Sequence, residues 1–250
     1  MKLFSFLLFL LFSFNQISAQ DYNAAIKEAD RLETIPNEKA ALAKFKEALK
    51  LQPTSLYALT KCSELSCRVG GREKSTKVRD EYYATAQLYA KTALKLHPNS
   101  DEANVAMAFS IAKTLMLKSG KEKITAVKEL KSYGDKAVTM NPKNFKAWHV
   151  LGKWNYEVSN LNALEKVAVK IIYGGLPAAS FNNSIMYYEK AKSLAPLFTL
   201  NYLELAKAYH KNDDDIKAIS LLNYLLSIKT QTEDDPRIKA EAQNLIKDWM

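Results

Sequence analysis

Basic side chains recur along this chain at positions where they could hold acidic groups. Lysine and arginine bind carboxylates and phosphates through charge-assisted hydrogen bonds, so a row of them can retain an anionic partner. The alternative is that these lysines only keep exposed helix turns solvated. The candidate partner-binding residues are Lys61, Arg68, Phe109, Lys113, Lys146, His149, Lys153, Tyr156 and Lys207.

The overall charge points in the same direction. The 250 residues contain 36 Lys and Arg against 27 Asp and Glu, which gives a formal net charge of +9. Such an excess favours nucleic acid, acidic protein segments or anionic lipid headgroups as partners, although an ordinary solvated surface can also carry it.

Catalytic chemistry has no visible basis in the sequence. The three histidines, His97, His149 and His210, lie in different parts of the chain. No H-E-x-x-H, G-x-S-x-G or phosphate-loop pattern occurs. We therefore expect a protein that is not an enzyme and that needs no cofactor.

Two features that could bind a metal are better explained in other ways. Cys62 and Cys67 are five residues apart, so on one helix they point about 140° apart and cannot form an unstrained disulfide. We expect both to be small buried hydrophobes. Residues 213–215 are three aspartates, but they lack the alternation and the distal glutamate of a calcium loop. A solvated turn with a helix cap is expected there, and no metal site.

The first twenty residues have the pattern of a secretory signal peptide. Lys2 precedes an apolar run over residues 3–14, and Ala19 supplies a small residue before the cut. Retention as a membrane anchor is the alternative, but a span needs about 20 apolar residues. We therefore expect a signal peptide over 1–20 and a mature domain over 21–250, periplasmic or secreted. No stable membrane span would remain after signal removal, and nucleic acid is not expected as a partner.

Four prolines reveal an internal repeat. Each follows an apolar, Ala-rich stretch, and an alanine lies five residues before each of them. A helix must stop near a proline, which lacks the amide donor, and a small alanine lets a neighbouring helix approach closely. The stretches therefore resemble the second helix of a tetratricopeptide unit. The prolines are Pro53, Pro98, Pro142 and Pro196, and the alanines expected to be buried are Ala48, Ala93, Ala137 and Ala191.

The first helix of the unit is clearest at residues 148–156, which match the W-x2-L-G pattern. The repeat prolines lie 45, 44 and 54 residues apart instead of 34, with the extra residues between the two helices of each unit. Pro236 opens a last helix with one apolar face, as a cap requires. The predicted fold is all-α: a tetratricopeptide-like superhelical array of antiparallel helix pairs with extended inter-helix segments and a C-terminal capping helix.

A closer resemblance lies within residues 141–211. The run WHVLGKWNYEVS at 148–159 is followed by ALEK at 163–166 and by YGGLPAASF at 173–181. Together these runs resemble the regulator of microtubule dynamics family. The resemblance implies a superhelical adaptor, in a family whose members are associated with microtubules, organelle contact sites or, in one case, phospholipid. The export signal departs from this pattern, so the microtubule role is not carried over.

Within this region, residues 161–172 predict an amphipathic helix. Packing against its own domain is the favoured interpretation. The alternative is a lid that lines an apolar cavity or touches an acyl chain. The residues on the apolar stripe are Leu161, Leu164, Ala168, Ile171 and Ile172.

These observations predict an exported, non-catalytic scaffold. It would bind other proteins, acidic ones included, through a basic concave groove formed by the first helix of each unit. The alternative is a lipid- or small-amphiphile-binding module that uses the insert at 161–172.

Overall fold

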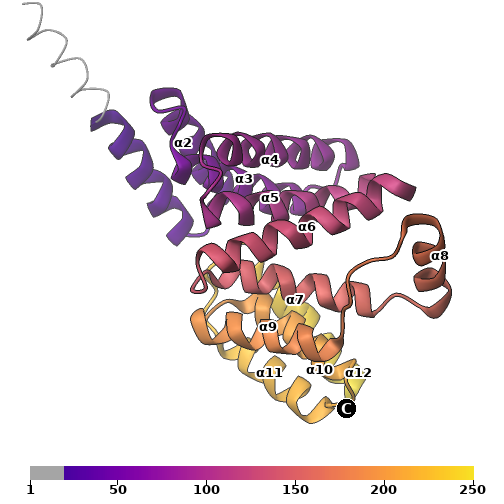
Figure 1. Cartoon of the computed structure of the whole chain (residues 1–250). Helices are drawn as coiled ribbons and strands as arrows, with labels where there is room; N and C mark the ends of the chain where they lie inside the picture. Colours follow the sequence, from indigo (N-terminus) through magenta and orange to yellow (C-terminus); the bar gives the residue numbers. More distant parts are fainter. Residues whose placement is uncertain (1–19) are drawn as a thin grey trace, which may run out of the picture.

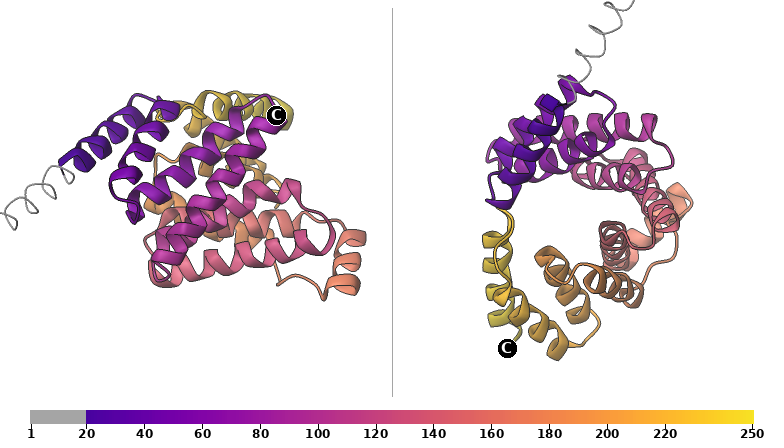
Figure 2. Two further views of the ribbon diagram at one scale, coloured as in Figure 1. Left: turned by 90° about the horizontal axis from the view of Figure 1, so that it is seen from above. Right: turned by 90° about the vertical axis from the view of Figure 1, so that its left-hand side faces the viewer.

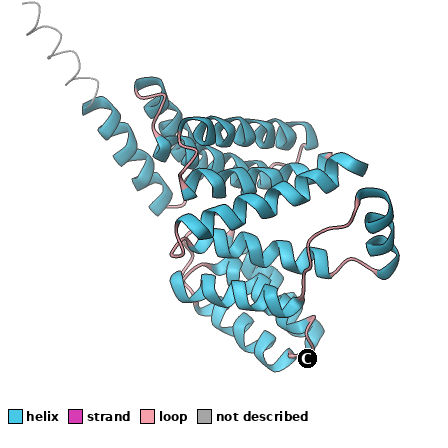
Figure 3. Cartoon of the chain, viewed as in Figure 1, coloured by secondary structure: helices cyan, strands magenta, loops and turns pink. Residues whose placement is uncertain are grey.

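The computed structural model describes residues 20–250, which form α-helices and contain no β-strand (Figures 1 and 3). A first helix covers residues 20–34. The helices that follow are α2 (Glu38–Leu51), α3 (Leu56–Arg72), α4 (Thr76–Leu96), α5 (Asp101–Thr114), the short 3-10 helix η1 (Leu115–Leu117), α6 (Gly120–Met140), α7 (Phe145–Ser159), α8 (Ala163–Tyr173), α9 (Phe181–Leu194), α10 (Thr199–His210), α11 (Asp215–Ser227) and α12 (Asp235–Trp249). The predicted all-α fold is confirmed. The predicted signal peptide lies outside the described residues apart from Gln20, and its cleavage stays a prediction.

Local sequence signals set where these helices begin and end. The hydroxyls of Ser55, Ser75 and Ser100 each accept a hydrogen bond from a backbone amide in the first turn of α3, α4 and α5. These acceptors satisfy amides that have no partner within the helix. At the other end, α2, α4, α6 and α9 each stop two residues before a proline, as the sequence predicts.

The helices pack as consecutive pairs, and the second members of the pairs are α2, α4, α6, α9 and α11. Helix α8 is inserted between the two members of the fourth pair, α7 and α9. The four alanines predicted to face neighbouring helices are fully buried, which confirms the register of the repeat: Ala48, Ala93, Ala137 and Ala191.

Close approach within the fourth pair depends on a glycine. The fully buried Tyr188 of α9 lies directly against Gly152 of α7. A Cβ atom added at Gly152 would be 2.6 Å from the Tyr188 ring, closer than carbon atoms can approach. The glycine of the W-x2-L-G pattern is therefore required by packing between the two helices.

The array curves until its two ends meet (Figure 2). The first helices α3, α5, α7 and α10 pack on one another in succession, and α10 packs on α12. Among the described residues, the second helices form no comparable contacts with each other. The first helices therefore lie on the inside of the curve. At the seam, the backbone amide of Glu38 donates to the Glu233 carboxylate at 2.6 Å. The sequence did not predict this closure.

The final helix covers the apolar end of the array, as predicted. Ile238 and Ala242 of α12 are buried in one cluster with residues of α10 and α11. The extra residues between the two helices of a pair lengthen α4 and α6 to 21 residues each and add α8. Across residues 20–250, no helix has both the length and the hydropathy needed to cross a bilayer.

Candidate functional site

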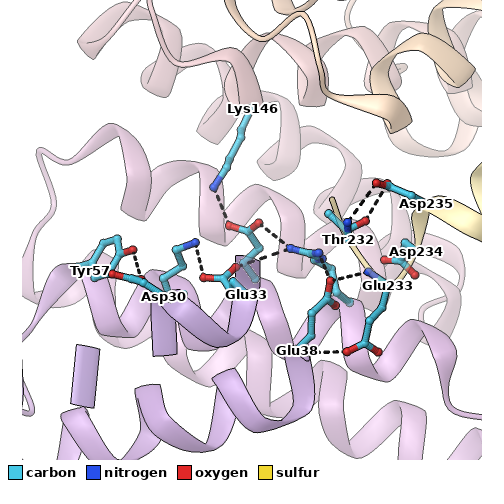
Figure 4. A network of polar contacts seen from close by, with 12 residues as sticks. Asp30, Glu33, Glu38, Tyr57, Lys146, Thr232, Glu233, Asp234 and Asp235 are labelled. Atoms are coloured by element: carbon cyan, nitrogen blue, oxygen red, sulfur yellow. Dashed lines mark hydrogen bonds and ion pairs between the residues drawn. The ribbon is translucent and has the colours of Figure 1, made fainter. Parts of the chain in front are cut away.

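The candidate site is the inner face, which we define as the side formed by the 20–34 helix, α3, α5, α7, α10 and α12. Most of the predicted partner-binding cations lie here and are half-buried. Five of the six predicted cations already face a carboxylate from another helix, and Figure 4 shows this for Lys146. The inner face therefore carries paired charges where the sequence predicted an excess of positive charge.

In the N-terminal half, the ion pairs form one connected network. The Lys61 ammonium lies 2.7 Å from the Glu33 carboxylate. Arg68 contacts both Glu33 and Glu38, and its guanidinium is 3.6 Å from Glu64. Lys146 of α7 reaches past α5 to Glu64 of α3 at 2.6 Å. The network links helices that are not neighbours in the sequence, so it holds the curve of the array.

The protonation of this network follows from its geometry. Burial alone would raise the pKa of Glu64, but Lys146, Lys61 and Arg68 together lower it to about 2. Burial likewise acts to lower the pKa of Lys146, and the carboxylates of Glu64 and Glu102 raise it instead. Both partners are therefore charged at neutral pH.

The C-terminal half has a second network around Glu204, which is buried. Lys153 of α7 lies 2.7 Å from the Glu204 carboxylate and 2.9 Å from Glu157. Lys207 lies 3.4 Å from Glu204 and 2.6 Å from Glu241 of α12. Burial acts to raise the pKa of Glu204, but the two lysines outweigh it and hold the pKa below its usual value. This network joins α7, α10 and α12.

His149 does not lie on an exposed groove surface, so that prediction is wrong. Its ring is buried between Phe109 and Phe198, with ring centroids 6.4 and 4.9 Å away. Its Nδ1 lies 3.0 Å from the Oδ1 of Asn201, whose amide nitrogen donates to the carbonyl of Tyr188. Because that oxygen is an acceptor, Nδ1 of His149 carries the proton. Burial lowers the pKa of His149.

The remaining predicted groove residues have different surroundings. The half-buried Tyr156 packs edge-on against Phe181, and the Lys153 ammonium lies 5.4 Å from its ring centroid. Lys113 is half-buried on α5 and forms no ion pair with any described residue. Among the predicted cations it is the one that a partner could reach without displacing an internal carboxylate.

The seam between the two ends contains charged residues that sequence reasoning missed. Arg72 at the end of α3 lies 2.7 Å from Glu38, 3.2 Å from Glu233 and 3.3 Å from Asp234. The Asp235 carboxylate accepts from the Thr199 hydroxyl at 2.6 Å and from two backbone amides of the preceding loop, which fixes this segment in place. No local pattern marks Arg72 as a seam residue, because Glu233 and Asp234 lie 161 and 162 residues away from it in the sequence.

The insert is a regular helix, but its apolar face does not pack on the domain as predicted. None of the residues of α8 is buried. Leu164 is 79% exposed, Ile171 78% and Ile172 65%, and Ala168 is exposed as well. Only Leu161, which precedes the helix, is half-buried. Figure 1 shows α8 standing out from the body of the array beside α6.

The other polar features have structural roles. Cys62 and Cys67 are unpaired and buried, as expected. Of the three aspartates, Asp213 ends a turn, Asp214 caps α11 by accepting from the amide of Lys217, and Asp215 is the first residue of that helix. Within residues 20–250, no cluster of His, Cys, Asp or Glu side chains has the geometry to hold a metal.

The helix pairs, their buried alanines and the curved inner layer define a protein of the tetratricopeptide class. A solved tetratricopeptide protein of Thermus thermophilus, TTC0263, superposes with a TM-score of 0.66 over 89% of this chain and 99% of its own, at 14% sequence identity.

Sequence comparison identifies the family. The family described as Regulator of microtubule dynamics protein 1-3 matches residues 25–250, and the chain belongs to it. Regulator of microtubule dynamics protein 1 of Bos taurus is 26% identical over 77% of this chain and 60% of its own length. The Mus musculus protein is 28% identical over 63% of this chain and 52% of its own length. The Caenorhabditis elegans protein is 24% identical over 74% of this chain and 80% of its own length. The chain thus spans about half to 60% of the length of the first two relatives.

Proposed function

We propose that this protein is a non-catalytic scaffold that acts outside the cytoplasm and holds an acidic segment of a partner protein on its inner face. The observation that carries this proposal is the placement of cations on three first helices, α3, α7 and α10, each paired with a carboxylate from a different helix. The cations concerned are Lys61, Arg68, Lys146, Lys153 and Lys207.

Such pairs are exchangeable. At Lys146 a partner's carboxylate can replace Glu64 without isolating either charge, because Glu64 still faces Arg68 and Lys61 after the exchange. The pairs are only partly desolvated, since the side chains of Lys146 and Glu64 are 24% and 29% exposed. Lys113 offers an additional cation on α5, between the two networks.

Export is the second part of the proposal. It rests on the charge at Lys2, the apolar run over 3–14 and the small residue Ala19. The relatives are named for microtubule dynamics, and an exported chain would not meet cytosolic tubulin. We therefore propose a different partner for this member of the family.

A charge-swap pair tests the binding proposal without confusing it with loss of fold. Lys146→Glu places two carboxylates together, and the double variant Glu64→Lys/Lys146→Glu restores an ion pair with the charges exchanged. We expect the double variant to regain only part of the stability lost in Lys146→Glu, because Arg68 and Lys61 also face position 64. Retention of the protein partner from envelope extracts should stay reduced, because the cation has moved from α7 to α3. Retention by the folded double variant at the wild-type level would refute the proposal.

A matched control uses lysines that point away from the inner face. Lys95 and Lys190 are exposed on the second helices α4 and α9. Changing both to Glu alters the net charge more than the swap does, so a purely non-specific charge effect would appear here first. We expect retention of the partner to stay unchanged.

The alternative function predicted from the sequence was a lipid-binding module with the insert as a lid over an apolar cavity. The geometry does not favour this arrangement, because α8 covers no buried apolar surface. The cleft next to it, about 420 Å³ in volume, is lined mainly by polar residues of α6. The exposure of α8 supports a different role.

A further inference from the structure

We infer that α8 and the adjoining edge of α6 dock this protein onto the surface of an anionic lipid bilayer. This inference goes beyond the proposed function and does not depend on it. We call this region the α8 surface and define it by its apolar residues Leu164, Val167, Ile171 and Ile172 and by its lysines Lys128, Lys131, Lys136, Lys166 and Lys170.

The apolar side of α8 has no partner within the described chain. Its four large aliphatic residues are between 52% and 79% exposed and follow one another along a single helix. Isolated apolar residues on a surface need no explanation, but a contiguous cluster marks an interaction site. We therefore expect this apolar cluster to be covered by a binding partner.

The helix is nevertheless well specified. Asn162 and Glu165 form a capping box at its start, with two hydrogen bonds of 2.8 Å. Gly174 ends it in the left-handed conformation, with φ of 73°, which favours glycine. Because both ends are capped locally, α8 stays helical without packing against a core.

The helix is also held at a fixed place beside α6. The Lys128 ammonium donates to the carbonyl of Tyr173 at 3.2 Å, and the Tyr173 hydroxyl lies against Gly120. Figure 1 shows the helix projecting at the edge of the array, away from the seam between the chain ends. An extended flat surface can therefore approach it without meeting the rest of the molecule.

The charge around the apolar cluster identifies the occupant. Helices α6 and α8 together contain seven lysines and four acidic residues, a net charge of +3. Lys128, Lys131 and Lys136 line the cleft of about 420 Å³ together with Asp135, whose carboxylate lies 2.7 Å from the Lys131 ammonium. We expect Lys128 and Lys136, which form no ion pair with a described residue, to face a lipid phosphate while the aliphatic residues of α8 enter the acyl boundary.

The length of α8 fixes how it would meet the bilayer. Its 11 residues are far short of the roughly 20 needed for a span. A short amphipathic helix with lysines at its borders instead lies in the interface, and its affinity rises with the content of anionic lipid. A protein groove would satisfy the aliphatic residues but gives no reason for the lysines around them.

The test places a polarity-sensitive dye on α8, so that the N-terminal apolar run cannot produce the signal. Ala168→Cys puts the label on the exposed helix, and Ala84→Cys puts it at an exposed position of α4. The native cysteines are buried and do not react in the folded chain. We expect vesicles of phosphatidylcholine with phosphatidylglycerol to shift the emission of the α8 label to the blue, and to leave the α4 label unchanged.

Two further variants separate the apolar and electrostatic contributions. In the Ala168→Cys chain, Leu164→Ser/Ile171→Ser should weaken vesicle binding by about tenfold or more. The matched control Leu88→Ser/Ile216→Ser removes equally exposed aliphatic residues elsewhere and should leave binding intact. Lys136→Gln/Lys170→Gln should reduce the preference for phosphatidylglycerol over phosphatidylcholine, and it keeps the Lys128 contact that holds α8 beside α6.

Three results would overturn the inference. The first is an emission that does not respond to either kind of vesicle. The second is an equal response to phosphatidylcholine alone. The third is self-association that Leu164→Ser/Ile171→Ser abolishes while vesicles have no effect, because the occupant would then be a second copy of the chain. None of these results bears on the charge-swap test of the inner face.

Discussion

Glu38 and Glu233 exchange hydrogen bonds across 195 residues of sequence. The amide of Glu38 donates to the Glu233 carboxylate at 2.6 Å, and the amide of Glu233 donates to the Glu38 carboxylate at 3.1 Å. Both carboxylates also face Arg72. This reciprocal pair closes the array, so the inner face is bounded by helices on all sides of the curve (Figure 2).

The first prediction concerns this seam. Arg72→Ala should lower the free energy of unfolding by about 1–3 kcal/mol, because it removes a partner from the buried carboxylate of Glu38 while Arg68 remains. Urea titration measures the loss, and small-angle X-ray scattering should show a larger radius of gyration. Arg237→Ala, which removes an exposed ion pair, should cost less than about 0.5 kcal/mol. Equal losses for the two variants would mean that the Arg72 ion pairs at the seam stabilise the protein no more than an exposed ion pair does.

The second prediction compares two helical glycines. Gly152→Ala should destabilise the protein by about 1–3 kcal/mol, because its Cβ would overlap the Tyr188 ring. At Gly71 the nearest atom, the Tyr83 hydroxyl, would be 3.7 Å away. Gly71→Ala should therefore leave stability unchanged or raise it by up to about 1 kcal/mol. Thermal unfolding followed by circular dichroism distinguishes the two, and a neutral Gly152→Ala would contradict the packing described for α7 and α9.

The third prediction is a pH dependence. The pKa of His149 is lowered from its ordinary value of 6.5 by burial, so the unfolded chain takes up a proton that the folded chain refuses. Stability should therefore fall as the pH drops below 6.5, with a slope of up to about 1.4 kcal/mol per pH unit. Glu64 and Glu204, whose pKa values are lowered, add losses only below 4.5. Denaturant titrations between pH 7 and 5 give the free energy of unfolding at each pH, and its slope against pH should be shallower for His149→Asn than for the wild type. Identical slopes would exclude His149 as the cause.

The fourth prediction concerns the energetic role of α8. Leu164→Ser/Ile171→Ser should change the free energy of unfolding by less than about 0.5 kcal/mol, because neither side chain is buried. Leu203→Ala, at a position that is 1% exposed, should cost about 2–5 kcal/mol. Urea midpoints measured side by side provide the comparison. A large loss from the α8 variant would show that the helix packs on the domain after all.

The repeat was predictable because its signals are local. Proline ends a helix wherever it occurs, and the small residue five positions earlier marks the contact with the next helix. These rules located the ends of α2, α4, α6 and α9 and the burial of Ala48, Ala93, Ala137 and Ala191. The family resemblance was carried by a continuous stretch of sequence, and it holds for residues 25–250.

The inner face was less predictable because its charges are paired over long distances. The sequence placed Lys146 and Lys153 on a first helix, but Glu64 and Glu204 lie 82 and 51 residues away from them. Periodicity also could not reveal that His149 is buried, since burial there depends on Phe198 of the next pair. The prediction that α8 packs on the domain was wrong for a different reason. Its sequence has the pattern of a packed amphipathic helix, and no local signal shows that its apolar face is left uncovered.

The most direct test of the central claim is site-specific photo-crosslinking in the cells that make the protein. A photoreactive amino acid is placed at position 113 or 156 on the inner face, and at 95 or 190 on the outer helices α4 and α9. The scaffold proposal predicts a discrete covalent adduct with a protein from the inner positions, and none from the outer ones. Adducts from positions 95 and 190 alone would show that the partner binds elsewhere and would contradict the proposal.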